Sequence, residues 1–131
     1  VHIHPSVIKI AYNAVPHDRF VLITDSLMAA GLGDGEYELA GQPVRVENGI
    51  ARTGDGAIAG SMLDLFTAVK NLSVFAGIPF EQALPAATSV PARMWRLDGV
   101  TGSLRVGLRA DMLLLDERGG IDRVYAAGER I

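Results

Sequence analysis

The stretch from Phe20 to Asp25 constrains the fold of this chain more than any other. Five residues that are mostly β-branched or aromatic are followed directly by a carboxylate. A continuous run of this kind, without polar alternation, is typical of a strand buried on both faces, as in a parallel sheet. In closed α/β barrels the reacting groups lie at the carboxyl ends of the strands, where Asp25 would stand. The alternative is that Asp25 only caps a turn or the next helix.

The residues before this run predict a strand–helix–strand unit. Residues 1–5 can form the end of a strand, and residues 6–15 carry apolar side chains at helical spacing after Pro5. Two parallel strands joined by a helix are expected to connect in the right-handed sense. His2 and His4 would point to opposite sides of an extended segment, so they cannot share a metal ion without a bend. A solvated loop histidine is the simpler interpretation for His4, whereas His2 would lie at the same barrel end as Asp25.

Composition narrows the class of protein. The chain has 131 residues, of which 49% are hydrophobic and 21% charged, enough for one globular domain with a core. A net charge of −3 without a basic cluster argues against nucleic acid and anionic membranes as partners. The absence of cysteine excludes disulfides and thiolate metal sites and fits a cytoplasmic protein. Because a functional-looking cluster follows Val1 at once, we expect a piece of a longer protein.

The middle of the chain predicts a small antiparallel excursion over residues 36–53. Asn48-Gly49 between two β-like runs is a strong hairpin signal. A glycine-rich return over residues 54–60 follows, and Ser61 with Asp64 three residues later then predicts the start of a helix that ends at Gly77. The amino end of this helix could bind an anion, or Ser61 could simply cap it.

The last third changes from helix to strand. Residues 79–87 predict a helix that Pro85 should kink or shorten, and residues 89–97 a last short helix with Met94 and Trp95 in the core. Short strands are expected at residues 104–106, 112–115 and 123–126, as a second small β layer. These strands are too few to close a sheet by themselves, so further chain or another molecule should complete them.

Two sets of residues resemble a known family. Residues 101–116, with Gly102, Gly107 and the Ala110-Asp111 pair before an aliphatic run, resemble the C-terminal signature of the amidohydrolase superfamily. Residues 1–5, 22–31, 58–61 and 89–93 look like the corresponding stretches of the N-acetylglucosamine-6-phosphate deacetylase family, in the same order and spacing. The resemblance covers essentially the whole chain, as the C-terminal third of such a protein.

This resemblance implies an α/β fold. The chain would be the C-terminal fragment of a metal-dependent hydrolase with a (β/α)8 TIM barrel and a small β-sandwich. Residues 1–98 would hold the last β/α units, with residues 1–4 and 20–25 as strands seven and eight and a hairpin insertion at about 36–53. Residues 99–131 would supply C-terminal strands of the sandwich.

The resemblance also implies a site. Asp25 matches the catalytic aspartate of the family, His2 a histidine that holds the amino-sugar phosphate, and Ile58, Ala59 and Gly60 border the sugar. A divalent metal, Zn²⁺ by preference, would activate water, but the family's metal ligands have no counterparts in this chain. By itself the chain is then expected to lack a metal centre and to be inactive. A homodimer acting on an amino-sugar phosphate is implied as well.

The expected reaction is hydrolysis of the N-acetyl group of N-acetylglucosamine 6-phosphate. A carboxylate at a rigid strand end suits proton transfer from water and on to the leaving amine. One alternative is another amidohydrolase, dihydroorotase-like or imidazolonepropionase-like. The other is a non-catalytic fragment that associates through exposed strand edges, which its size in solution would reveal.

Overall fold

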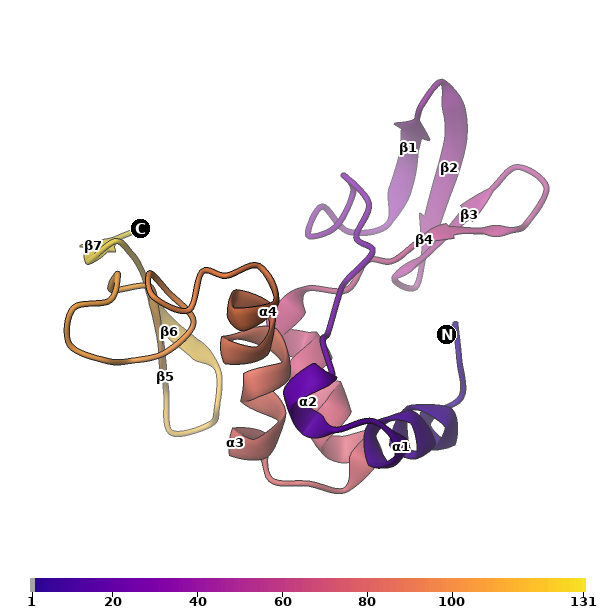
Figure 1. Ribbon diagram of the computed structural model, residues 1–131. Coiled ribbons are helices and arrows are strands. Elements are labelled where there is room, and N and C mark those ends of the chain that lie inside the picture. Colours follow the sequence, from indigo (N-terminus) through magenta and orange to yellow (C-terminus); the bar gives the residue numbers. More distant parts are fainter. Residues whose placement is uncertain (1) are drawn as a thin grey trace. The chain divides into compact units, whose positions relative to one another are not determined.

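The computed structural model describes residues 2–131, and Figure 1 traces its helices and strands. The helical elements are α1 (Pro5–Ala14), η1 (His17–Arg19), α2 (Leu65–Ala76), α3 (Phe80–Ala83), η2 (Leu84–Ala87) and α4 (Ser89–Met94). The strands are β1 (Gly35–Leu39), β2 (Gln42–Glu47), β3 (Ile50–Thr53), β4 (Ile58–Gly60), β5 (Met112–Leu115), β6 (Ile121–Ala126) and β7 (Glu129–Arg130). The chain divides into two compact units, residues 1–87 and 88–131. Among the described residues, no helix is long and apolar enough to cross a bilayer.

The helices of the first unit share one hydrophobic core. Helix α1 packs against α2, and the two lie side by side in Figure 1. Tyr12 of α1 meets Val69 and Leu72 of α2 in this core, and all three side chains are at most 2% exposed. Phe20 and Leu22 pack against the same cluster. The core therefore supports the extended segment that leads to Asp25.

Helix α1 confirms the prediction for residues 6–15 to within one residue at each end. Pro5 stands in its first turn, where the missing N–H costs no hydrogen bond. His4 caps the helix, since its Nδ1 accepts from the backbone N–H of Ser6 at 3.2 Å. Pro85 was predicted to kink or shorten its helix, and the shortening is confirmed, because α3 gives way to the 3-10 turn η2 at Leu84.

The cap of α2 differs from the prediction. Asp64, and not Ser61, is the N-cap, and its carboxylate accepts from the backbone N–H of Thr67 at 2.7 Å and from the Thr67 hydroxyl at 2.6 Å. Ser61 lies further from the helix. Its hydroxyl accepts from the N–H of Leu63, which precedes the first helical residue, Leu65. The predicted end of the helix is confirmed, since Gly77 adopts a left-handed φ of 72° that glycine accepts without strain.

The Asp64 cap makes the stability of the first unit depend on pH. Hydrogen bonds from the hydroxyl and the backbone N–H of Thr67 hold the pKa of Asp64 below its ordinary value of 3.8. A carboxyl with a lowered pKa in the folded state stabilises fully above its unfolded pKa, and that contribution is lost as the pH falls through the folded pKa. We expect Asp64→Ala to lower the free energy of unfolding by about 1 kcal/mol at pH 7 and by progressively less below pH 4.

Urea unfolding across this pH range measures the effect. Asp64→Asn is the matched control, because an asparagine cap accepts the same N–H without a titrating group. A constant difference between wild type and Asp64→Ala down to pH 2 would contradict the assignment.

The hairpin predicted over residues 36–53 is confirmed as part of a four-stranded antiparallel sheet in the order β1-β2-β3-β4. Val44, Val46 and Ala51 face a second core and are at most 2% exposed, while the alternate residues of these strands face solvent. The Asn48-Gly49 turn is fixed by Asp34, whose carboxylate accepts from both backbone N–H groups at 2.7 and 3.1 Å. The turn between β2 and β3 thus combines the Asn-Gly pair with a carboxylate 14 residues earlier in the chain.

The predicted buried strand at residues 20–24 is wrong for the described part of the chain. The segment belongs to no ladder, Ile23 is 76% exposed, and Leu22 donates only to the carbonyl of Ala86 at 2.9 Å. Residues 2–4 form no strand either, and Val1 lies outside the described residues. The strand–helix–strand unit is therefore not formed. A parallel strand needs hydrogen-bonded neighbours on its edges, and residues 2–131 provide none for this segment.

The second unit consists of α4 and the antiparallel sheet β5-β6-β7. The strands predicted at 112–115 and 123–126 are confirmed, but residues 104–106 form a loop in which Leu104 is 79% exposed. Met94 and Trp95, predicted in the core, are 60% and 70% exposed because they lie at the end of α4, beyond its buried Val90 and Ala92. The assignment of residues 1–98 and 99–131 to two domains stays a prediction.

Asp111 ties the loops of this unit together. Its carboxylate accepts from the backbone N–H of Ala127 at 3.0 Å, from the Thr101 hydroxyl at 2.8 Å and from Arg109 Nε at 2.6 Å. These bonds, the one from Ala127 first, lower the pKa of Asp111 below its usual range. The acidic residue of the Ala110-Asp111 pair therefore has a structural role here.

Gly102 is the position in this unit where only glycine fits. Its φ is 91°, and a Cβ there would lie 2.5 Å from Ala92 Cβ and 3.1 Å from the carbonyl oxygen of Thr88. Neither atom can move without shifting α4. We expect Gly102→Ala to lower the free energy of unfolding by about 2 kcal/mol or more, the sum of backbone strain and overpacking.

Thermal unfolding of the two variants Gly102→Ala and Gly99→Ala tests this. A Cβ at Gly99 would meet nothing within 4 Å, so this control should be close to neutral. Equal melting temperatures for the two variants would contradict the close approach at Gly102.

Candidate functional site

The candidate site is the junction between the end of the extended segment and strand β4. Ser26 and Ser61 form an isolated parallel bridge, in which the backbone N–H of Ser61 donates to the carbonyl of Asp25 at 3.0 Å. The N–H of Leu27 donates in turn to the carbonyl of Ser61 at 2.9 Å. The structure therefore brings predicted catalytic Asp25 next to Gly60, the last of the three residues predicted to border the sugar.

Asp25 itself has an unusual backbone. Its φ is 50°, in the left-handed region that residues with a Cβ seldom adopt. The side chain is exposed, and its carboxylate forms no hydrogen bond to any other residue in the range 2–131. Strained backbone of this kind gathers at functional sites, where the surroundings hold it in place. An exposed carboxylate on a fixed backbone is suited to accepting and returning a proton.

The three residues of β4 differ in their surroundings. Ile58 is 38% exposed, Ala59 packs against the core under the hairpin sheet, and Gly60 leaves no room for a side chain. A Cβ on Gly60 would lie 2.8 Å from Leu27 Cδ2 and 3.4 Å from the Asp25 carbonyl oxygen. The close approach of the two segments therefore depends on glycine here.

His2 is not brought to this junction by any described contact. Its side chain is exposed and forms no hydrogen bond within residues 2–131. His4 caps α1, and the ring of His17 stacks on Tyr12 with the centroids 4.2 Å apart. The roles of these other two histidines are thus structural, and the assignment of His2 to the substrate stays a prediction.

The described residues do not fit a metal centre. Nowhere in the range 2–131 do three or more histidine, aspartate or glutamate side chains come together as possible ligands. Asp25 belongs to no such group within these residues. No chemical step in this chain is therefore assigned to a metal.

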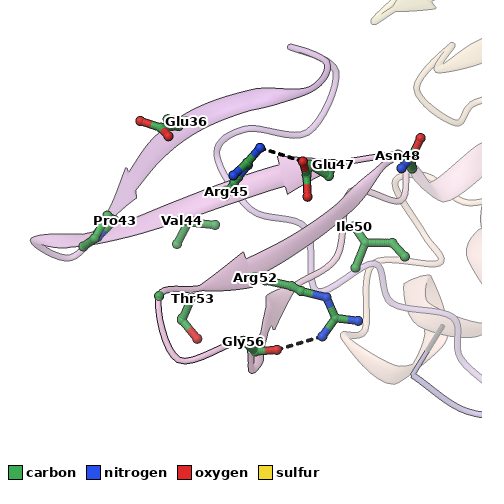
Figure 2. A pocket seen from close by; sticks show the side chains of 11 residues that line it. Glu36, Pro43, Val44, Arg45, Glu47, Asn48, Ile50, Arg52, Thr53 and Gly56 are labelled. Atoms are coloured by element: carbon green, nitrogen blue, oxygen red, sulfur yellow. Dashed lines mark hydrogen bonds and ion pairs between the residues drawn. The ribbon is translucent and has the colours of Figure 1, made fainter.

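A hollow lies elsewhere in the first unit, on the solvent face of the hairpin sheet (Figure 2). Arg45 and Arg52 stand opposite one another on β2 and β3, and Figure 2 shows how each is engaged. Arg45 pairs with Glu47 at 2.7 Å, and Arg52 Nη1 donates to the carbonyl of Gly56 at 2.7 Å. None of the predicted site residues lines this hollow, so we do not count it as part of the site.

Sequence reasoning missed the role of the two serines at the junction. Ser61 was interpreted as a helix cap, and Ser26 carried no prediction. Ser61 is the one buried polar residue among those described, at 8% exposed, and its hydroxyl accepts from the N–H of Leu63 at 2.8 Å. The Ser26 hydroxyl donates to the carbonyl of the same Leu63. No local pattern signals this arrangement, because it joins residues 37 positions apart.

Comparison with known proteins identifies the class. A profile of the amidohydrolase family matches residues 17–131. The chain belongs to the amidohydrolase family, a family of metal-dependent hydrolases, as the signature around Asp111 predicted.

The individual relatives that match this chain are named as deacetylases of amino-sugar 6-phosphates. An Escherichia coli K12 protein named "Putative N-acetylgalactosamine-6-phosphate deacetylase" is 38% identical over 98% of this chain and 76% of its own length. An N-acetylgalactosamine-6-phosphate deacetylase of E. coli O157:H7 is also 38% identical, but the match covers 34% of its length. An N-acetylglucosamine-6-phosphate deacetylase of Vibrio furnissii is 34% identical over 99% of this chain and 32% of that protein. The chain thus spans about three quarters of one of these relatives and about a third of the other two.

Solved structures that resemble this chain are also N-acetylglucosamine-6-phosphate deacetylases. The N-acetylglucosamine-6-phosphate deacetylase of Thermotoga maritima superposes with a TM-score of 0.89 at 35% identity, over 99% of this chain and 36% of that one. The Mycobacterium smegmatis enzyme, an aspartate-to-alanine mutant in complex with N-acetyl-D-glucosamine 6-phosphate, gives a TM-score of 0.89 at 31% identity, over 99% of this chain and 35% of that one. The predicted resemblance to these deacetylases is confirmed.

Proposed function

We propose that this chain is the part of an amino-sugar-6-phosphate deacetylase that carries the catalytic carboxylate. The reaction is hydrolysis of the N-acetyl group of N-acetylglucosamine 6-phosphate to acetate and glucosamine 6-phosphate. One observation carries the proposal. The backbone of Asp25 is hydrogen-bonded to Ser61, next to Gly60, in a chain that aligns over nearly its whole length with named deacetylases.

Asp25 would move the protons of this reaction. Water adds to the acetyl carbonyl carbon, and the Asp25 carboxylate accepts the proton that the water loses. When the C–N bond breaks, the same carboxyl returns that proton to the amine nitrogen. The exposed side chain of Asp25 supports both steps, because no residue in the range 2–131 hydrogen-bonds its carboxylate oxygens.

The metal ligands of the proposed site would come from outside the described residues. The proposed metal is Zn²⁺ or a similar divalent ion, and its ligands are not among the residues gathered here. The architecture proposed for the whole protein is a (β/α)8 barrel in which residues 1–4 and 20–25 are the last two strands. The lack of any strand ladder at residues 20–24 within the described chain, the 76% exposure of Ile23 and the 36% coverage of the T. maritima enzyme support this. His2, Ile58, Ala59 and Gly60 would contact the sugar phosphate.

A graft tests the proposal. In the T. maritima deacetylase the matching segment is replaced by this chain, and acetate release from N-acetylglucosamine 6-phosphate is measured. We expect turnover from the graft and far less from its Asp25→Asn variant. A folded graft that releases no acetate, beside an active parent, would overturn the proposal. The 131-residue chain assayed alone is expected to release none.

A second substrate is favoured by a specific observation. Two E. coli relatives at 38% identity are named for N-acetylgalactosamine 6-phosphate, the epimer at carbon 4. The same graft assayed with both epimers decides between them. A higher kcat/KM for the galactosamine compound would assign this chain to that substrate.

The isolated chain is expected to self-associate. Three large apolar side chains of the first unit, Ile10, Ile23 and Met28, are 67%, 76% and 73% exposed. Apolar side chains exposed to this degree are available for contact with other protein. Light scattering on the purified chain should therefore give a mass of at least twice the monomer's 13.9 kDa. A monodisperse, folded monomer would contradict association through these surfaces.

A further inference from the structure

Ser26 and Ser61 hold Asp25 against strand β4 through a set of hydrogen bonds that we call the serine clasp. We propose that Ser26 is a positioning residue for Asp25, and that the clasp keeps the carboxylate at a fixed place beside the sugar-binding segment. The inference rests on the proposed function, since it assigns Asp25 the proton-transfer role. It adds a residue that touches neither water nor sugar and acts through the backbone.

The clasp is built around Leu63. The Ser26 hydroxyl donates to the Leu63 carbonyl, and the Leu63 N–H donates to the Ser61 hydroxyl at 2.8 Å. Both backbone polar groups of Leu63, its N–H and its C=O, therefore bond to the two serine side chains. Leu63 leads directly to Asp64, the N-cap of α2, so the clasp anchors the Asp25 loop to the start of a core helix.

The backbone on either side of Ser26 is held as well. The carbonyl of Asp25 accepts from Ser61 N–H at 3.0 Å, and the N–H of Leu27 donates to the Ser61 carbonyl at 2.9 Å. The two backbone bonds fix the direction of the chain, and the Ser26 side chain adds a third attachment between them. Loss of the hydroxyl would leave the Leu63 carbonyl without its partner.

Asp25 needs such restraint because its backbone is strained. At a φ of 50° the Cβ is crowded, and an unrestrained residue would rotate toward negative φ. That rotation would turn the Cβ, and with it the carboxylate, out of the direction that the present backbone gives it. The junction is also tight, since a Cβ on Gly60 would lie 2.8 Å from Leu27 Cδ2. Small displacements of Gly60 or Leu27 would therefore also displace Asp25.

Ser26 is not a nucleophile in this arrangement. Its hydroxyl proton is committed to the Leu63 carbonyl, and no histidine or carboxylate hydrogen-bonds its oxygen among the described residues. A serine nucleophile needs a base within hydrogen-bond reach. Positioning is therefore the role that its contacts support.

Kinetics of the grafted deacetylase test the positioning role. We expect Ser26→Ala to lower kcat for acetate release by about 10- to 100-fold while KM changes by less than about threefold, because a misplaced acid–base group slows chemistry without weakening sugar contacts. Ser26→Thr keeps the hydroxyl and should restore most of kcat. Ser61→Ala should act in the same direction as Ser26→Ala.

Ser73 provides the matched control. Its hydroxyl donates to the carbonyl of Ile78 at 2.6 Å, the same kind of bond, at the carboxyl end of α2. Ser73→Ala should leave kcat and KM unchanged. If Ser26→Ala retains the kcat of the graft, or if Ser26→Thr is as slow as Ser26→Ala, the inference is overturned.

Amide hydrogen exchange in the 131-residue chain separates this inference from the proposed function. Ser26→Ala should speed exchange at Ser61 and Leu27 about 10-fold or more, while core amides such as that of Leu72 keep their protection. Ser73→Ala should leave the junction amides unchanged. If the wild-type graft releases no acetate, the proposed function fails, and exchange still decides on the clasp. Unchanged exchange at the Ser61 and Leu27 amides in Ser26→Ala would refute the serine clasp.

Discussion

Replacing Asp25 with asparagine in the grafted deacetylase is expected to lower kcat by about 100- to 10,000-fold, with little change in substrate affinity. The amide has nearly the shape of the carboxyl group, but it cannot accept the proton of the attacking water or return it to the amine. The loss should appear equally in kcat and kcat/KM, as for an interaction made only in the transition state.

Steady-state acetate release measures the loss of kcat, and equilibrium binding of the substrate measures whether its affinity is unchanged. Asp18→Asn is a suitable control, since Asp18 is an exposed acidic residue in η1 that the site does not use. Turnover of Asp25→Asn within about threefold of the graft would remove Asp25 from the mechanism. Loss of binding instead of turnover would make it a substrate ligand.

Truncating Leu72 to alanine is expected to lower the free energy of unfolding of the chain by about 2–5 kcal/mol. Leu72 is 1% exposed and lies between Tyr12, Val69 and Ala76 in the core of the first unit. The substitution removes buried methyl groups and leaves a cavity that two packed helices cannot close. For a domain of this size such a loss is a large part of the total stability.

Val74 on the same helix supplies the control. Its side chain is 75% exposed, so Val74→Ala should change the free energy of unfolding by less than about 0.5 kcal/mol. Urea unfolding followed by circular dichroism compares the two variants. Similar midpoints would mean that α2 does not form the core described here. Because Phe20 and Leu22 pack on the same cluster, Leu72→Ala should also reduce the turnover of the graft.

In the proposed enzyme, these contacts give each part of the chain a separate role. The helical core fixes the extended segment, the serine clasp fixes the residue at its end, and Asp25 transfers protons. In this proposal the chain contributes the acid–base group, while residues 2–131 bring together no group of three or more possible metal ligands.

The sequence by itself determined the elements whose causes are local. Pro5 before an apolar periodicity predicted α1, Asn48-Gly49 predicted the hairpin, and Gly77 predicted the end of α2, and all three are confirmed. Turns and caps depend on a few neighbouring residues, so a sequence pattern is enough to recognise them. The signature around Asp111 likewise indicated the family, because a characteristic run of residues can be recognised without knowledge of contacts.

Only the tertiary structure decided what depends on distant partners. The run at residues 20–24 has the composition of a buried strand, yet it forms none here, since a strand exists only with neighbours to bond its edges. Helix α2 begins at Leu65 and is capped by Asp64, while Ser61 lies earlier in the chain and forms a bridge with Ser26. The clasp at Asp25 joins segments far apart in sequence, and hydrogen bonds of that range are set by packing, which no local pattern records.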